Sequence, residues 1–164
     1  MKMKRKDLAL LLILLPAVLL QEVIHAQEPY FELQDLDNQW TSYSALKGEQ
    51  LTVIDFWATW CQPCLRSLPA LNDLYNEYKS SGVNFIGISI DGPRNQSKLK
   101  PFVNSMGLDY PILRDINSEI MSEMSVTTVP TLLIIDKEGE VVFYHEGYRP
   151  GDEKYIRSNI EENL

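Results

Sequence analysis

The amino-acid sequence predicts an α/β protein in which a central mixed sheet carries helices on both faces. Apolar runs at residues 51–56 and 83–90 are typical of strands buried on both faces. Between them, residues 62–79 repeat apolar side chains every three or four positions, as an amphipathic helix does. This order of strand, helix and strand implies a right-handed parallel crossover, and a predicted hairpin near the C-terminus adds antiparallel strands.

The segment before the first buried strand predicts a hairpin of its own. Residues 31–33 have an extended pattern, residues 35–38 form a polar turn, and a second extended piece surrounds Trp40. After the second buried strand, residues 98–106 have a helical pattern that ends at a glycine. Pro101 favours a regular helix that begins near that residue.

The C-terminal third predicts a strand, a short helix, a hairpin and a closing helix, in that order. We expect these elements at residues 110–114, 118–124, 131–144 and 152–162. No repeat, low-complexity tract or linker interrupts the pattern. We therefore expect one domain, residues 27–164.

The first 26 residues are predicted to be a secretory signal peptide. Four basic side chains precede an apolar stretch at residues 8–20, and Ala26 is a small residue suited to cleavage after it. That stretch has 13 residues, fewer than the roughly 20 that span a bilayer. An uncleaved N-terminal membrane anchor is the alternative.

The chain is acidic, with 15 basic and 23 acidic side chains and a formal net charge of −8. Because the predicted signal holds four basic and two acidic residues, its removal leaves a net charge of −10. This charge disfavours nucleic acid and anionic membrane surfaces as partners.

Both cysteines of the chain, Cys61 and Cys64, lie at the predicted start of the 62–79 helix. Unpaired backbone N–H groups and the positive end of the helix dipole favour the thiolate of Cys61 there. Cys64 lies one turn inside, and we expect it to resolve a mixed disulfide formed at Cys61. Pro63 lacks an N–H where the helix needs none, which stiffens the turn. The spacing predicts a redox-active dithiol.

Other roles for this cysteine pair fit less well. A zinc site needs two more ligands, and the chain after the predicted signal offers one histidine, His145. Covalent haem attachment needs a histidine directly after the second cysteine, where the chain has leucine. Closing so short a loop restrains little of the unfolded chain, so a purely structural disulfide is disfavoured. We expect no metal and no cofactor, and we interpret His145 as a surface residue.

The segment FWATWCQPC, residues 56–64, resembles the active-site signature of the thioredoxin superfamily. The wider pattern is similar to the exported TlpA/ResA-like thiol-disulfide oxidoreductases, through Pro69, the Val-Pro-Thr segment at residues 129–131 and the turn at residues 137–139. The similarity extends over nearly all of the chain after the signal. It implies a thioredoxin-like fold with an N-terminal β-hairpin and a central insert.

The resemblance also implies where a substrate would bind. Pro130 corresponds to a cis-proline that packs beside the cysteine pair, and the backbone of Val129 would pair with an incoming peptide. An ordinary trans proline at the start of a strand is the alternative. Trp60 and Pro63 would shape the surface around the attacking sulfur.

The chain departs from the exported family at two positions. Asp55 stands where many members have asparagine, and Ser67 stands where they have glutamate. Asp55 matches instead the buried aspartate of thioredoxin, which exchanges a proton with the buried cysteine. Thioredoxin's partner lysine is replaced by Gly87, so we expect the pKa of Asp55 to rise toward the working pH. A polar residue satisfied by water or a hydroxyl is the alternative.

These patterns predict an exported, periplasmic thiol-disulfide oxidoreductase that is a monomer and reduces disulfides of other proteins. The resemblance implies a membrane thiol electron donor and pathways such as cytochrome c maturation. A thiol peroxidase is a second hypothesis, because residues 91–115 resemble the corresponding stretch of peroxiredoxins; neither cysteine, however, has threonine three residues before it. A non-enzymatic binding module is a third hypothesis, which the intact cysteine pair disfavours.

Overall fold

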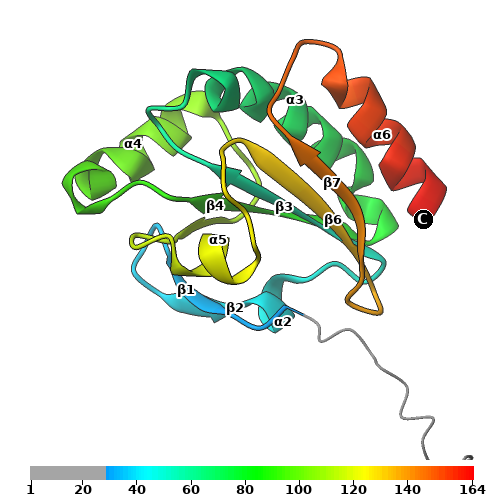
Figure 1. Ribbon diagram of the computed structural model, residues 1–164, viewed down its shortest axis with the longest axis horizontal. Coiled ribbons are helices and arrows are strands. Elements are labelled where there is room, and N and C mark those ends of the chain that lie inside the picture. The colour runs from blue at the N-terminus through cyan, green and yellow to red at the C-terminus, as the bar shows by residue number, and fades with distance from the viewer. Residues whose placement is uncertain (1–28) are drawn as a thin grey trace, which may run out of the picture.

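The structure is a computed structural model that describes residues 29–164. The predicted signal peptide lies outside the described residues. The rest of the chain builds a seven-stranded mixed sheet with the strand order β2-β1-β5-β4-β3-β6-β7 (Figure 1).

The helices and strands occur in the predicted order, and their bounds are close to the predicted ones. The strands are β1 (Glu32–Asp35), β2 (Trp40–Ser42), β3 (Leu51–Trp57), β4 (Val83–Ser89), β5 (Ile112–Arg114), β6 (Thr131–Asp136) and β7 (Val141–Glu146). The helices are α2 (Tyr43–Leu46), α3 (Gln62–Tyr78), α4 (Gln96–Met106), α5 (Glu119–Glu123) and α6 (Asp152–Asn163), with 3-10 turns at Lys79–Ser81 and Pro93–Asn95.

The pairing of the strands confirms the predicted mixed sheet. β3 is parallel to β4, and β4 is parallel to β5. The predicted hairpins, β1–β2 and β6–β7, are both antiparallel, and they extend the sheet at its two edges. β6 also pairs with β3 in the antiparallel sense. β3 therefore lies between two strands, and its carboxyl end leads directly into α3.

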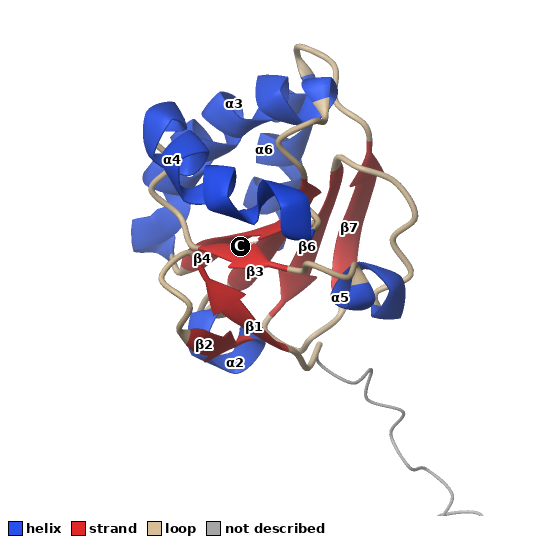
Figure 2. Ribbon diagram, turned by 90° about the vertical axis from the view of Figure 1, so that its left-hand side faces the viewer, coloured by secondary structure: helices blue, strands red, loops and turns tan. Residues whose placement is uncertain are grey.

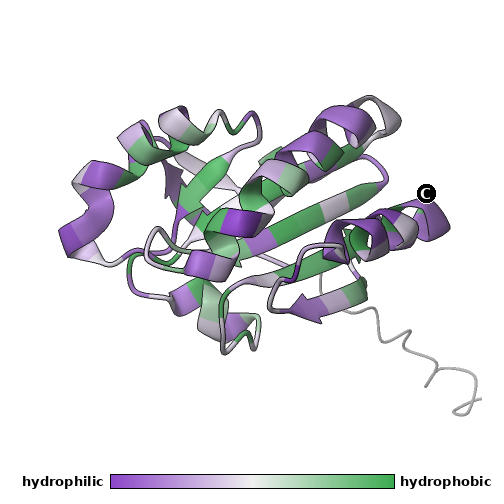
Figure 3. Ribbon diagram, turned by 90° about the horizontal axis from the view of Figure 1, so that it is seen from above, coloured by the Kyte–Doolittle hydropathy of each residue, from purple (hydrophilic) through white to green (hydrophobic). Residues whose placement is uncertain are grey.

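Helices cover both faces of the sheet, as the sequence predicts. α3, α4 and α6 lie on one face, and α2 and α5 lie on the other (Figures 1 and 2). Alternate residues of β3 supply the two cores: Val53 and Trp57 pack under α3, whereas Ile54 and Phe56 face the opposite side. Seen from above, the strands are predominantly hydrophobic and the helices turn polar residues outward (Figure 3).

Two elements differ from the sequence-based expectations. α4 begins at Gln96 and contains Pro101, rather than beginning near that proline. Tertiary contacts hold the first turn despite the missing N–H: Leu99 is fully buried, and the Gln96 amide donates a hydrogen bond to the carbonyl of Asp91. The short helix α2 was not expected; Ser42 caps it by accepting a hydrogen bond from the N–H of Ala45 at 3.3 Å.

Gly87 of β4 is a point of very close packing. It pairs with Asp55 of β3 on one side and with Ile112 of β5 on the other. A Cβ atom at this position would lie 2.5 Å from Cδ1 of Ile112, 3.1 Å from the Tyr110 ring and 3.2 Å from Nε1 of Trp57. The space that a side chain at position 87 would need is already filled by its neighbours.

We therefore predict that Gly87→Ala lowers the free energy of unfolding by about 1–3 kcal/mol, because the added methyl group overpacks a rigid aromatic site. Gly92→Ala is the matched control: an added Cβ meets nothing within 4 Å there, and φ is −68°. Denaturant unfolding of both variants in the oxidised state measures the difference. Equal stability of the two variants would contradict the packing argument.

Candidate active site

Cys61 and Cys64 form a disulfide at the junction of β3 and α3. The sulfur–sulfur distance is 2.06 Å and the two Cα atoms lie 5.2 Å apart. Cys61 is the N-cap residue of α3, and its sulfur accepts a hydrogen bond from the backbone N–H of Cys64 at 3.2 Å. The attacking position predicted from the sequence is therefore at the end of a 17-residue helix.

The surroundings of the two sulfurs are unequal. Cys64 is fully buried, whereas Cys61 is 5% exposed and the neighbouring Trp60 is 58% exposed. Cys61 is therefore nearly buried in the disulfide. Cys61 keeps this small exposure whereas Cys64 has none, so an exchange partner would meet Cys61 first.

The first turn of α3 favours negative charge on Cys61. This turn holds no acidic residue, and Pro63 occupies one of its first two positions. The backbone N–H of Cys64 already points at the Cys61 sulfur. A thiolate formed there would be stabilised by this hydrogen bond and by the positive end of the helix dipole.

Asp55 is buried beneath this turn, with 2% of its surface exposed. Burial raises the pKa of its carboxyl from 3.8 to about 7. Within residues 29–164, its Oδ2 atom has no hydrogen-bond partner, and the same is true of Nε1 of Trp57 and the hydroxyl of Tyr110. Burial raises the pKa of the Tyr110 phenol, and the nearby charge of Asp55 raises it further. Asp55 is thus a poorly solvated carboxyl, and burial is the cause of its raised pKa.

The raised pKa makes stability depend on pH. Between pH 3.8 and about 7, the folded chain keeps a proton on Asp55 that the unfolded chain has lost. The stabilisation is therefore fully present below the lower value and is lost as the pH rises through about 7. Its size is on the order of 4 kcal/mol.

Asp55 lines a small cavity together with Ser67, Pro130 and Leu132. The hydroxyl of Ser67 donates a hydrogen bond to the carbonyl of Cys64 at 2.9 Å, which connects the cavity wall to the dithiol turn. The Val129–Pro130 peptide bond is cis, the geometry that the resemblance implies. The fold thus brings Asp55 and Pro130, far apart in the sequence, to one cavity under α3.

A second buried carboxylate, Asp91, holds the loop that leads to the cysteines, and sequence reasoning missed it. Asp91 is fully buried. It accepts hydrogen bonds from the N–H of Thr59 at 2.8 Å and from its hydroxyl at 2.6 Å. It also accepts hydrogen bonds from the Ser89 hydroxyl at 2.9 Å and from the Asn95 side-chain amide at 3.3 Å. The available signal was an aspartate at the carboxyl end of the strand adjacent to the cysteine strand.

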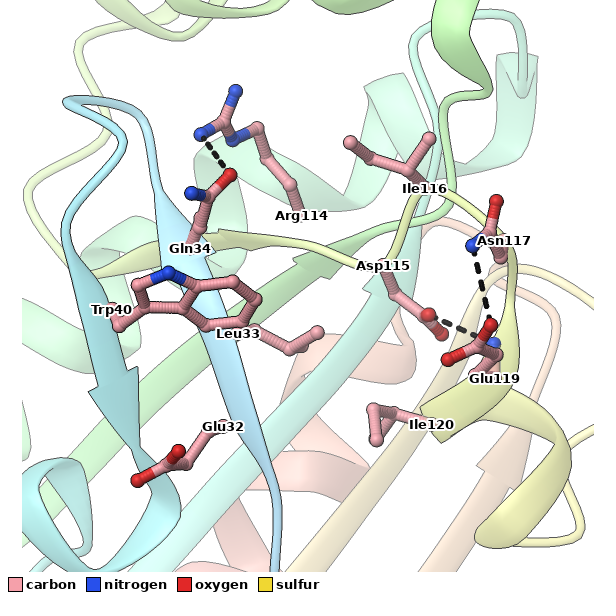
Figure 4. Close-up of a pocket in the computed structure, with 10 residues that line it drawn as sticks. All are labelled: Glu32, Leu33, Gln34, Trp40, Arg114, Asp115, Ile116, Asn117, Glu119 and Ile120. Carbon is pink, nitrogen blue, oxygen red and sulfur yellow. Dashed lines mark hydrogen bonds between the residues drawn. The ribbon is translucent and has the colours of Figure 1, made fainter.

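A separate pocket of about 190 Å³ lies between the β1–β2 hairpin and the segment that joins β5 to α5 (Figure 4). Arg114 donates a hydrogen bond to the side chain of Gln34 at 3.2 Å there. The carboxylate of Asp115 accepts one from the N–H of Glu119 at 2.8 Å. Neither cysteine lines this pocket, so it is not part of the dithiol site.

Within residues 29–164, no cluster of three or more His, Cys, Asp or Glu side chains could hold a metal ion. Over the same range, no helix has the length and apolar character needed to cross a membrane.

We predict that Asp91→Asn lowers the free energy of unfolding of the oxidised protein by about 1–3 kcal/mol, because the amide group replaces one acceptor oxygen and leaves buried donors unpaired. Asp73→Asn, on the exposed side of α3, is the matched control and should change stability by less than about 0.5 kcal/mol. Denaturant unfolding measures both. Equal effects would show that the Thr59 contacts contribute little.

The chain is similar to known thiol-disulfide proteins. Residues 24–144 match the AhpC/TSA family. The thiol-disulfide oxidoreductase ResA of Bacillus thuringiensis is 36% identical over 119 residues, which cover 73% of this chain and 67% of ResA.

Solved structures give the same result. A Chlorobium tepidum protein assigned as the thiol:disulfide interchange protein DsbE has a TM-score of 0.76 and 26% identity, covering 84% of this chain and 94% of its own. StoA from Bacillus subtilis has a TM-score of 0.67 and 25% identity, covering 82% and 98%. These similarities confirm the thioredoxin-like fold and a thiol-disulfide redox activity. The chain belongs to the AhpC/TSA family of thioredoxin-like proteins, and its relatives include thiol-disulfide oxidoreductases named ResA.

Proposed function

We propose that this protein is an exported reductase of disulfides in other extracytoplasmic proteins. The observation that carries the proposal is the asymmetry of the Cys61–Cys64 pair. Cys61, at a helix N-terminus, is 5% exposed, whereas Cys64 is fully buried, and Asp55 in the strand that precedes the pair has a pKa of about 7. Thiol-disulfide exchange needs one thiolate that can attack the substrate and a second thiol that later breaks the mixed disulfide. Cys61 fits the first role and Cys64 the second.

The proposed reaction begins with the reduced dithiol. The Cys61 thiolate attacks one sulfur of the substrate disulfide, and the other substrate sulfur leaves as a thiolate that takes a proton from water. Asp55 then removes the proton of the Cys64 thiol. The Cys64 thiolate attacks Cys61, the mixed disulfide breaks, and the second substrate sulfur leaves and is protonated. Two electrons pass to the substrate, and the product is a Cys61–Cys64 disulfide like that of the structure.

Asp55 suits the role of base because of its environment. A carboxyl that titrates near pH 7 can both accept and return a proton under ordinary conditions. Gly87 stands where thioredoxin has its partner lysine, and Tyr110 and Ile112 fill the space that a side chain at this position would need. Burial therefore acts on the carboxyl without the opposing effect of a lysine at this position.

The proposed substrate surface surrounds Cys61. The exposed ring of Trp60 would pack against the incoming chain, and Pro63 would keep the first turn of α3 rigid beside it. The backbone of Val129, before the cis-proline Pro130, would pair with the substrate as an added strand. The ResA name of the relatives supports a dithiol that acts on disulfides.

Export and electron supply complete the proposal. Residues 1–26 would be the signal peptide, and residues 27–164 would act as a monomeric domain in the periplasm. A membrane thiol donor would reduce the disulfide after each cycle, in pathways such as cytochrome c maturation. The redox equilibrium with glutathione tests the direction: a potential near that of a strong oxidant would contradict the reductase assignment.

A peroxidase and a pure binding module are less well supported. The residues three positions before the two cysteines are Ala58 and Cys61, not threonine. The intact disulfide, with its buried partner sulfur, fits exchange chemistry rather than passive binding. A peroxide-consumption assay separates the first alternative from the proposed reductase.

We predict that Cys64→Ser, with the resolving thiol removed, accumulates mixed disulfides between Cys61 and protein substrates. Affinity capture from cells under non-reducing conditions, followed by mass spectrometry, identifies the attached proteins. Cys61→Ser is the matched control and should capture none. Failure of Cys64→Ser to retain any protein would count against protein substrates.

We predict that the rate of disulfide reduction by the wild-type dithiol rises with pH through about 7, because Asp55 must be ionised to act as the base. Asp55→Asn should be slower and should lose this step in the pH profile, while the exposed control Asp73→Asn keeps it. In unfolding experiments, Asp55→Asn should also lose the decrease in stability between pH 4 and 7, about 4 kcal/mol in size. An unchanged pH profile of the rate would refute the role of Asp55.

A further inference from the structure

The strands β3 and β4 end side by side, at the edge of the sheet that carries the dithiol. Trp57, the last residue of β3, is directly opposite Ser89, the last residue of β4, in a parallel pair. The N–H of Ile90 still donates to the carbonyl of Trp57 at 2.9 Å. Thr59 and Asp91 follow these two strand ends at the same distance along their chains. The parallel register therefore brings Thr59 and Asp91 together.

Thr59 lies in the short turn between β3 and α3. Ala58 begins this turn and is fully buried, and the N–H of Cys61 donates to the carbonyl of Ala58 at 3.1 Å. The turn carries the Cys61 sulfur at its end and the exposed ring of Trp60 just before it. Because Thr59 lies between Ala58 and these two residues, its position decides where both of them are placed.

Asp91 holds Thr59 at two points. Its Oδ2 atom accepts a hydrogen bond from the backbone N–H of Thr59 at 2.8 Å, and its Oδ1 atom accepts one from the hydroxyl at 2.6 Å. Each oxygen also has a donor from the β4 side: the Ser89 hydroxyl reaches Oδ2 and the Asn95 amide reaches Oδ1. Two contacts from one carboxylate fix the orientation of Thr59 as well as its position.

We propose that Asp91 is a positioning residue for thiol-disulfide exchange: through Thr59 it holds the turn from which Cys61 attacks. Asp91 acts through Thr59, so it takes no part in the bonds that form and break. The inference rests on Cys61 as the attacking thiol, as proposed above. It applies to either direction of exchange, because the same sulfur forms the mixed disulfide in both.

The contact between Asp91 and Thr59 matters most when the disulfide is open. In the oxidised protein, the bond to Cys64 holds the Cys61 sulfur covalently. In the reduced protein, the turn has to keep this sulfur beside the N–H of Cys64, which lies 3.2 Å from it in the structure. A thiolate that leaves this place loses the hydrogen bond and the field of the helix dipole. Loss of the contact should therefore destabilise the dithiol more than the disulfide.

The charge of Asp91 predicts the opposite effect. A negative charge close to the cysteine turn disfavours a thiolate, so removing the charge alone would stabilise the dithiol. The donors that reach Asp91 from Thr59, Ser89 and Asn95 are uncharged. Asp55, the other buried carboxyl near the turn, has a pKa of about 7 and is the same in every variant below. Positioning and charge thus give shifts of opposite sign.

The redox equilibrium of the full-length protein with glutathione tests the inference. In this equilibrium, two glutathione thiols are oxidised to one disulfide as the Cys61–Cys64 disulfide is reduced. Thr59→Val removes the hydroxyl contact but keeps the charge of Asp91. It should shift the equilibrium constant toward the protein disulfide by about three- to tenfold, and tenfold corresponds to about 30 mV. Thr59→Ser keeps the hydroxyl and should restore the wild-type equilibrium.

This equilibrium separates positioning from general stability, because a residue that stabilises the oxidised and reduced folds equally leaves it unchanged. The matched control is Thr52→Val, at the other end of β3, where the buried Thr52 hydroxyl accepts a hydrogen bond from the N–H of Gly48 at 3.0 Å. This variant should leave the equilibrium unchanged. Asp91→Asn should shift it in the same direction as Thr59→Val, against the effect of the lost charge.

Three results would overturn the proposal. They are a wild-type equilibrium in Thr59→Val, equal shifts in Thr59→Val and Thr52→Val, and a shift toward the dithiol in Asp91→Asn. The last would show that the carboxylate acts on the cysteines through its charge. Failure of Cys64→Ser to capture proteins would instead count against the proposed substrates, and the effect of Thr59→Val on the glutathione equilibrium would stand.

Discussion

The burial of β3 along its whole length is the constraint on which the active site depends. All seven of its residues are buried between β4 and β6, with one core above and another below. A strand in this position cannot shift its register without exposing one set of apolar side chains, so its carboxyl end is fixed. The Cys61–Cys64 turn and the start of α3 follow from that fixed point, and Asp55 is held away from water for the same reason.

Two buried carboxylates near this turn have opposite environments and therefore opposite uses. Asp91 accepts four hydrogen bonds, two of them from Thr59, and serves as a firm anchor for the loop before the cysteines. Asp55 leaves one oxygen without a partner among the described residues, and its pKa rises to about 7. Burial without hydrogen bonds to that oxygen favours the neutral form of the Asp55 carboxyl. The same residue type thus supplies rigidity at one position and proton affinity at another.

Most of the fold could be predicted because its signals are local. The apolar run of β3, the three- and four-residue spacing in α3 and the two hairpins all depend on neighbours in the sequence. The misses were caused by distant contacts. α4 extends five residues before Pro101 because Leu99 is buried and the Gln96 side chain donates a hydrogen bond to Asp91. Neither contact can be predicted from the residues next to it in the sequence. His145 was interpreted as a surface residue because nothing in its own strand indicates that it lines the small cavity beside Asp55.

The sequence by itself determined that this is an α/β protein with a dithiol at the start of a helix. The patterns of apolar residues predict the fold class, and the cysteine spacing after an apolar strand predicts the dithiol. It also indicated a raised pKa for Asp55, because an acid in an apolar run has few ways to be solvated. Only the tertiary structure decided what surrounds that acid. The Tyr110 ring over Gly87, the anchor at Asp91 and the cavity shared with His145 all come from separate elements, and their positions are fixed when the sheet and the helices pack together.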